Sequence, residues 1–124
     1  ADFLEDQEAL TPEFIASIER GQADLRSGQA RFAGTTFRGQ ATEIYSREFD
    51  SIFLKLSQST QDRLEFRIRE LGRRLGDYSH HRLQGRPECR LRAGDYRVIY
   101  EFNLARNELY LITLGHRREI YRVG

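Results

Sequence analysis

The sequence is poor in cysteine and has no long apolar run. Cys89 is the only cysteine among the 124 residues, which excludes an internal disulfide and a cysteine-based zinc site. No apolar run approaches the roughly 20 residues that a membrane span requires. The N-terminal residues lack the basic-then-apolar order of a signal peptide. Together these absences predict a cytoplasmic protein with no membrane partner.

Lysine is nearly absent as well, because 19 of the 20 basic residues are arginine and only Lys55 is lysine. Arginine is favoured for planar, bidentate contact with phosphate, although a GC-rich genome produces the same bias without any function. The charges are also segregated. Residues 1–34 carry seven acidic and three basic residues, a net −4, whereas residues 35–124 carry twelve and seventeen, a net +5. This asymmetry indicates that the two parts attract each other or that the basic part binds an anion.

The first 34 residues predict one helix with extended ends. Thr11 is a good N-cap, Pro12 suits the first helical position, and Ser27-Gly28 ends the helix. A single helix of this length is not stable alone in water, so its apolar stripe must dock on the rest of the chain or on a second copy. That stripe consists of Phe14, Ile15, Ile18 and Leu25.

Residues 35–42 are predicted to form a linker, and residues 43–124 a single domain. A short strand, TEIYS, comes first, and Ser46 then caps a helix. Ser59 and Asp62 open a second helix. Because the connection is short, the two helices are expected to form an antiparallel hairpin. Their core positions, spaced at three and four residues, are Phe49, Ile52, Phe53 and Leu56 in the first helix and Leu64, Ile68, Leu71 and Leu75 in the second.

From Cys89 onward the pattern is that of strands, after a loop over 77–88. Aromatic and β-branched residues fill 89–93, 96–102 and 108–121, and Gly-Asp and Leu-Ala-Arg-Asn supply the turns between them. The order of strand, two helices and three strands predicts an α+β fold, in which an antiparallel sheet packs against an α-helical hairpin. The N-terminal helix is appended to this domain.

Three arginines around the Gly94-Asp95 turn are predicted to share one face of the sheet. A two-residue turn places Arg92 opposite Arg97, and because side chains alternate along a strand, Arg90 points the same way. The apolar residues between them would pack on the helices, which leaves the arginine face open. Like charges on neighbouring strands repel. Either an anion binds there, or each arginine pairs with a nearby acid: Glu88, Asp95, Glu101 or the acidic N-terminal segment.

Two motifs follow one another in this part of the chain: R-x-G-D-Y-R with VIYE after it, and the closing G-H-R-x-E-x-Y. In order and spacing they resemble the RelE/ParE toxin superfamily, and most closely its RelE-type mRNA interferases. The resemblance covers residues 43–122. It implies the RelE-like microbial RNase fold and the toxin of a type II toxin-antitoxin system in the cytoplasm of a bacterium or archaeon. Such a toxin inhibits translation by cleaving mRNA on the ribosome.

The resemblance also implies site residues. Its catalytic positions fall on Arg90, Arg97, Arg117 and Tyr121, which suit attack of an RNA 2′-hydroxyl on the adjacent phosphate. Guanidinium groups stabilise the charge that builds on that phosphate, so no metal or other cofactor is implied. The candidate RNA-binding residues around them are Arg86, Arg92, Arg118 and Arg122.

The chain departs from the superfamily pattern at two positions. The general base of the superfamily is often a lysine, whereas Arg90 stays protonated at ordinary pH. Tyr121, with a reference pKa of about 10, takes that role if the arginines favour its anion, or it stacks on a base. Glu88 stands where some relatives have a basic residue. Four further residues have either a role in acid-base chemistry or a purely structural role: His80, His81, His116 and Cys89.

The stretch PEFIASIERGQADLRSGQARF resembles the C-terminal end of antitoxins that wrap such toxins with a helix and a strand. With the charge segregation, this predicts that residues 1–34 are an antitoxin-like inhibitory segment joined, naturally or by engineering, to the toxin. The expected partners are mRNA on the ribosome and an antitoxin, in cis or in trans. The linker also permits a homodimer through exchange of the segment.

Two alternatives stay open. One is a ParE-like toxin that poisons DNA gyrase by binding and has no nuclease activity. The other is a catalytically silent interaction module.

Overall fold

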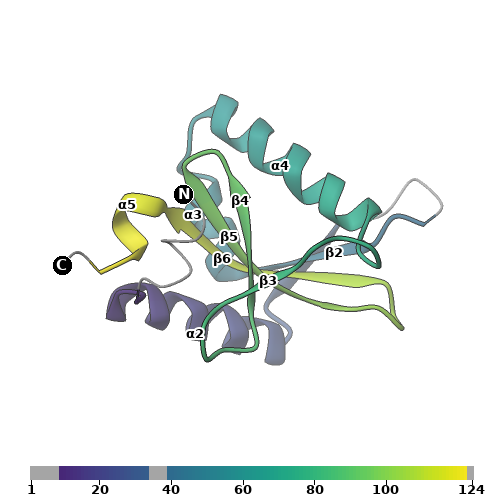
Figure 1. Ribbon diagram of the computed structural model, residues 1–124, viewed down its shortest axis with the longest axis horizontal. Helices are drawn as coiled ribbons and strands as arrows, with labels where there is room; N and C mark the ends of the chain where they lie inside the picture. Colours follow the sequence, from purple (N-terminus) through teal and green to yellow (C-terminus); the bar gives the residue numbers. More distant parts are fainter. Residues whose placement is uncertain (1–8, 34–38, 123–124) are drawn as a thin grey trace.

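The computed structural model describes residues 9–33 and 39–122, so that the predicted extended N-terminal end and much of the predicted linker lie outside it. These residues form one mixed sheet with helices on both sides (Figure 1). The elements are α2 (Pro12–Arg26), β1 (Ala30–Ala33), β2 (Thr42–Ser46), α3 (Arg47–Phe53), α4 (Gln58–Arg73), β3 (His81–Arg82), β4 (Cys89–Ala93), β5 (Tyr96–Asn103), β6 (Glu108–His116) and α5 (Arg117–Ile120). The predicted α+β class is therefore confirmed.

The strand order in the sheet is β1-β2-β6-β5-β4-β3. All neighbouring strands are antiparallel except β2 and β6, which run parallel, so the sheet that was predicted to be antiparallel is mixed. The predicted hairpin register is correct, since Arg92 lies opposite Arg97 and Arg90 opposite Ile99. Gly94 in the turn has a φ of 62°, a left-handed conformation that glycine adopts without steric cost.

The sheet separates two hydrophobic cores. On one face α4 contributes Leu64, Ile68 and Leu71, which pack in one cluster with Leu91 and Val98. Phe49 of α3 belongs to the same cluster, so both predicted helices of the domain share one core. On the other face Phe14 and Ile18 of α2 pack with Ile99, Ile112, Ile120 and Tyr121. Figure 1 shows α4 and α2 on opposite sides of the strands.

The N-terminal residues are integrated into this fold by a helix and a strand. Thr11 accepts a hydrogen bond from Phe14 N as the predicted N-cap of α2. At Gly21 an added Cβ would lie 2.2 Å from Ile112 O, so only glycine allows this helix to approach β6 so closely. Strand β1 pairs antiparallel with β2 and extends the sheet by one strand. We call residues 9–33 the N-terminal segment.

Local boundaries differ from prediction in three places. The predicted last strand ends at His116, because the His116 side chain accepts from Arg118 N and caps the short helix α5. Helix α4 starts after Ser57 rather than at Ser59, since the Ser57 hydroxyl accepts from Thr60 N. The predicted loop 77–88 contains β3, which pairs with β4. No helix in the described part of the chain is long and apolar enough to cross a membrane.

Candidate functional site

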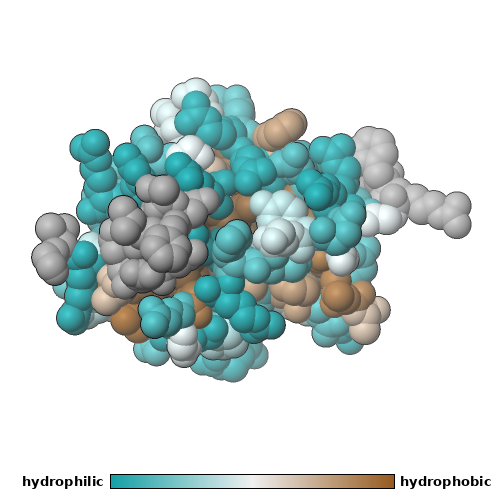
Figure 2. All heavy atoms as spheres, in the orientation of Figure 1, coloured by the Kyte–Doolittle hydropathy of each residue, from teal (hydrophilic) through white to brown (hydrophobic). Residues whose placement is uncertain are grey.

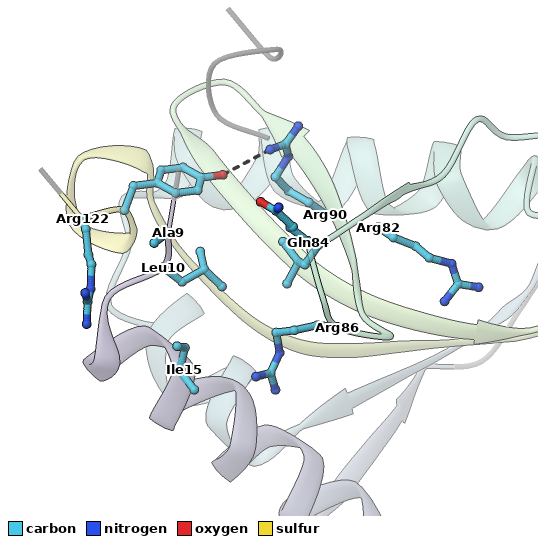
Figure 3. Close-up of a pocket in the computed structure, with 10 residues that line it drawn as sticks. Ala9, Leu10, Ile15, Arg82, Gln84, Arg86, Arg90 and Arg122 are labelled. Carbon is cyan, nitrogen blue, oxygen red and sulfur yellow. Dashed lines mark hydrogen bonds between the residues drawn. The ribbon is translucent and has the colours of Figure 1, made fainter. Parts of the chain in front are cut away.

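A cavity of about 400 Å³ lies between the N-terminal segment and the sheet edge. Four arginines and a phenol line it: Arg82, Arg86, Arg90, Arg122 and Tyr121. Ala9, Leu10 and Ile15 of the N-terminal segment supply an apolar wall, as Figure 3 shows. The cavity therefore combines a high density of positive charge with a wall that belongs to a different part of the chain.

Arg90 and Tyr121 meet in this cavity. Arg90 Nη1 donates a hydrogen bond to the Tyr121 hydroxyl oxygen, and 3.3 Å separates the two atoms (dashed line in Figure 3). Arg90 is 5% exposed and Tyr121 6% exposed. The N-terminal segment holds the backbone around Tyr121, because Arg122 N donates to Ala9 O and Thr11 N donates to Ile120 O, both bonds being below 3 Å. A ligand can contact the pair fully only if this segment moves.

The expectation of an open arginine face is wrong for Arg90 and Arg97. Arg97 is fully buried, and its Nη1 donates to Gly94 O and Tyr96 O over 2.8 and 3.0 Å. These bonds stabilise the β4–β5 turn. Arg92, in contrast, is exposed. The pattern of the strands predicts the correct face for these side chains but carries no information on what covers that face.

Arg117 lies at the same turn as Arg97. Its backbone N donates to Asp95 O over 2.8 Å, and its Nε lies 3.3 Å from Asp95 Oδ1. The structure thus distributes the four predicted catalytic residues over two adjacent places. Arg90 and Tyr121 line the cavity, whereas Arg97 and Arg117 contact the turn between β4 and β5.

The predicted RNA-binding residues also separate. Arg86 and Arg122 line the cavity, Arg118 is exposed on α5, and Arg92 lies in a second groove. Sequence reasoning missed Arg82, another cavity arginine, because it lies in a predicted loop and only its pairing in β3 brings it beside β4.

Glu88, the unusual acid near the cavity, is 2% exposed and connects the toxin-like domain to α2. Its carboxylate accepts from Arg86 Nε and from Gln22 Nε2, each over 2.9 Å, and Gln22 Nε2 also donates to Glu101. Burial acts to raise the pKa of Glu88, but the hydrogen bonds from Arg86 and Gln22 outweigh it and hold that pKa below the usual value. Glu88 therefore partly offsets the positive charge and gives α2 a polar anchor.

The side chains of His80, His116 and Cys89 make structural contacts, whereas that of His81 makes none within the described part of the chain. His80 contacts the Tyr100 hydroxyl and Leu75 O through its two ring nitrogens and stacks on Phe102. His116 caps α5, and Cys89 is buried in the α4-side core. His81 is exposed on β3.

The predicted contacts of the inhibitory segment all lie on the α2 face. Phe14 and Ile18 are buried in the core there, Leu25 packs against that core, and Ile15 lines the cavity.

A comparison with models of known protein families identifies the family of this chain. The family model described as "ParE toxin of type II toxin-antitoxin system, parDE" matches residues 36–121. The chain therefore belongs to the ParE toxin family of type II toxin-antitoxin systems, which implies an antitoxin partner. No curated protein sequence matches the chain. The matched stretch starts after α2 and β1, so the N-terminal segment lies outside the family domain.

Proposed function

We propose that the family domain is an RNA-cleaving toxin of the RelE type, and that the N-terminal segment holds it inactive. The observation that carries this proposal is the cavity in which four arginines surround a phenol. Such a cavity suits a phosphodiester, because guanidinium groups match phosphate geometry in pairs of hydrogen bonds.

In the proposed reaction the 2′-oxygen of one nucleotide attacks the adjacent phosphorus. A bond from O2′ to phosphorus forms while the bond from phosphorus to O5′ breaks, which leaves a 2′,3′-cyclic phosphate and a 5′-hydroxyl. Arg90 stabilises the negative charge on the phosphoryl oxygens. In this scheme Tyr121 first loses its own proton to solvent, its phenolate beside Arg90 then accepts the 2′-hydroxyl proton, and solvent supplies the proton taken up by O5′. Repulsion among the cavity arginines falls when a phosphodiester binds, and it falls most when the dianionic transition state binds. The site therefore binds the transition state more tightly than the substrate.

Arg117 and Arg97 have different roles in this scheme. Arg117, whose side chain is 45% exposed beside Asp95, can turn toward a bound strand. Arg97 is a positioning residue, because its bonds to Gly94 O and Tyr96 O fix the turn that carries Asp95.

Inhibition by the N-terminal segment follows from the packing. Phe14 and Ile18 pack in the core on the α2 side of the sheet. The backbone of Ala9 and Thr11 forms hydrogen bonds with the residues on either side of Tyr121. A tethered segment acts at an effective concentration in the millimolar range, so docking in cis is favoured over exchange with a second chain when geometry permits both.

The proposal is tested with Gly21→Ala in the full chain. The added methyl collides with Ile112 O, which weakens docking of α2 by about 1–3 kcal/mol. Cleavage of mRNA on purified translating ribosomes should then rise by at least about fivefold. Glu19→Ala on the exposed side of α2 is the matched control and should leave cleavage unchanged. Adding Tyr121→Phe to Gly21→Ala should lower cleavage by about 10²-fold or more.

A second candidate is poisoning of DNA gyrase, which the parDE description of the matching family favours. Replacing Arg117 and Tyr121 together in the Gly21→Ala chain separates the two functions. Growth inhibition should disappear for a nuclease and persist for a gyrase poison. A chain that inhibits growth in none of these variants is a silent interaction module.

A further inference from the structure

A second hollow lies next to the cavity and is lined by residues of α4, β3 and β4. It has a volume of about 380 Å³ and is lined by Arg67, Arg74, Tyr78, His81 and Arg92. Arg90 lines this groove as well as the cavity, so the two hollows meet at the proposed catalytic arginine. We call this second hollow the α4 groove.

The α4 groove is built by one face of α4 and its C-terminal extension. Arg63, Arg67 and Arg74 are four and seven residues apart, which places them along the same side of the helix. Arg67 Nε donates to Arg92 O over 3.1 Å, and Arg67 Nη2 donates to the Tyr78 hydroxyl over 3.3 Å. At the other end, Arg63 lies against Gly94, as an added Cβ there would be 2.9 Å from Arg63 Nη1. Arg67 is therefore held against β4 and Arg63 against the β4–β5 turn, while Arg74 lies beside Tyr78 at the opposite end of the groove.

The charge around the α4 groove is positive. Arg67 pairs with Glu70, and Arg74 lies 3.8 Å from Asp77, a pair in which both side chains are more than half exposed. An exposed pair of this kind contributes little free energy, so a phosphate can take the place of Asp77. The Arg74 guanidinium also lies 5.7 Å from the Tyr78 ring centroid, which keeps its planar group at the groove wall. The region over α4 in the upper part of Figure 2 is largely hydrophilic, as expected for such a surface.

We propose that the α4 groove binds backbone phosphates of the same single RNA strand whose reacting phosphate lies between Arg90 and Tyr121. This inference rests on the proposed nuclease function and names the path of its substrate. The strand crosses the edge of β4 at Arg90, with the reacting linkage in the cavity and neighbouring nucleotides along Arg92, Arg67 and Arg74.

Among the described residues, none of the N-terminal segment lines the α4 groove, whereas three of them wall the cavity. The two hollows should therefore respond differently to the segment. In the full chain the α4 groove binds RNA while the cavity is covered, and displacing the segment adds cleavage to a strand that is already held.

The test uses the full chain and a short, fluorescently labelled single-stranded RNA in which every 2′-hydroxyl is methylated. This probe cannot be cleaved, so the assay reports binding alone. Arg74→Gln with Arg92→Gln should weaken binding by roughly fourfold to twenty-five-fold, at about two- to fivefold for each phosphate that is no longer bound. The slope of log affinity against log salt should fall in magnitude by about 1.4, or about 0.7 for each of these two phosphates.

Arg73→Gln with Arg106→Gln is the matched control. Both arginines are exposed, neither lines the α4 groove, and the pair removes the same charge. Its salt slope should equal that of the unmodified chain. Three results would each show that the α4 groove is not an RNA site. They are equal salt slopes for the two double variants, no binding of the probe to the full chain, and competition by a polyglutamate peptide that is as strong as competition by RNA. Retained probe binding without any cleavage by the Gly21→Ala chain would instead reject the nuclease function.

Discussion

The two faces of the sheet differ in where their cores come from. On the α4 face every buried member of the core, from Ala41 to Leu114, lies within the family domain. On the α2 face two buried members, Phe14 and Ile18, come from the N-terminal segment, and the family domain supplies only the other side. The family domain is thus complete on one face and needs a cover on the other. The proposed catalytic pair lies under that cover.

The contacts of the two helices differ in chemistry as well. Both helices place apolar side chains in a core, but the polar contacts of α4 with the sheet come from the partly exposed side chains of Arg67 and Arg69, whereas Ser17 of α2 makes buried ones. Ser17 Oγ lies 2.7 Å from both Glu48 Oε2 and Thr113 Oγ1, and Arg20 forms an ion pair with Glu48. Polar anchors depend on pH and salt to a degree that apolar contacts do not. This difference fits the proposed inhibitory role of the N-terminal segment.

The strongest effect should come from a pair of substitutions that separates the two cores. Ile68→Ala on α4 should lower the free energy of unfolding of the whole chain by about 2–5 kcal/mol, because it opens a cavity in the core of the family domain. Ile18→Ala on α2 removes an equally buried side chain, yet the family domain should stay folded. Urea unfolding measures the first effect. Hydrogen exchange measures the second, with faster exchange over 12–26 and unchanged protection over 96–102. Faster exchange over both ranges in Ile18→Ala would contradict the separation.

The fold was largely predictable where short-range chemistry decides it. A two-residue turn fixes the register of Arg92 and Arg97, and the Thr11-Pro12 pair marks the start of α2. The site was less predictable because burial depends on distant segments. No local sequence pattern indicates that the N-terminal segment covers Arg90 or that Arg82 lies beside β4. The short helix α5 was missed for a different reason, because its cap is His116 and histidine is not among the residues preferred at a helix N-cap.

Glu48→Gln should rank second in effect. Its carboxylate accepts from Ser17 and from two nitrogens of Arg20, so the neutral amide loses charge-assisted hydrogen bonds worth about 1.5–3 kcal/mol. Docking of α2 should weaken by this amount while the family domain keeps its stability. Cleavage on ribosomes should rise in parallel with exchange over 12–26. A rise in exchange without a rise in cleavage would separate docking from inhibition.

The same anchors predict the pH dependence of docking. Burial acts to raise the pKa of Glu48, but hydrogen bonds from Arg20 and Ser17 prevail and hold the pKa below its usual value, as Arg86 and Gln22 do for Glu88. A carboxyl whose pKa is lowered by docking stabilises the docked state above its free pKa of about 4.3. That stabilisation is lost as pH falls through the lowered pKa. NMR of the Ile18 methyl groups should therefore report release of α2 below about pH 4, and Glu48→Gln should reduce the pH dependence.

The weakest effect should come from β1. Arg31 forms an ion pair with Asp50 over 2.9 Å and lies 4.4 Å from the Tyr45 ring centroid, but more than half of its side chain is exposed. Arg31→Ala should weaken docking by about 0.2–1 kcal/mol, less at high salt. Thermal unfolding at two salt concentrations measures this. A loss as large as that of Glu48→Gln would show that the strand, rather than α2, dominates docking.

The proposed function depends on a covered cavity that cleaves RNA once the N-terminal segment is displaced. Mapping the 5′ ends of transcripts in cells that produce the Gly21→Ala chain is the decisive test. We expect new 5′-hydroxyl ends within translated regions, and no such ends with Gly21→Ala and Tyr121→Phe combined. Growth arrest of the Gly21→Ala cells with broken DNA and no new transcript ends would overturn the nuclease function.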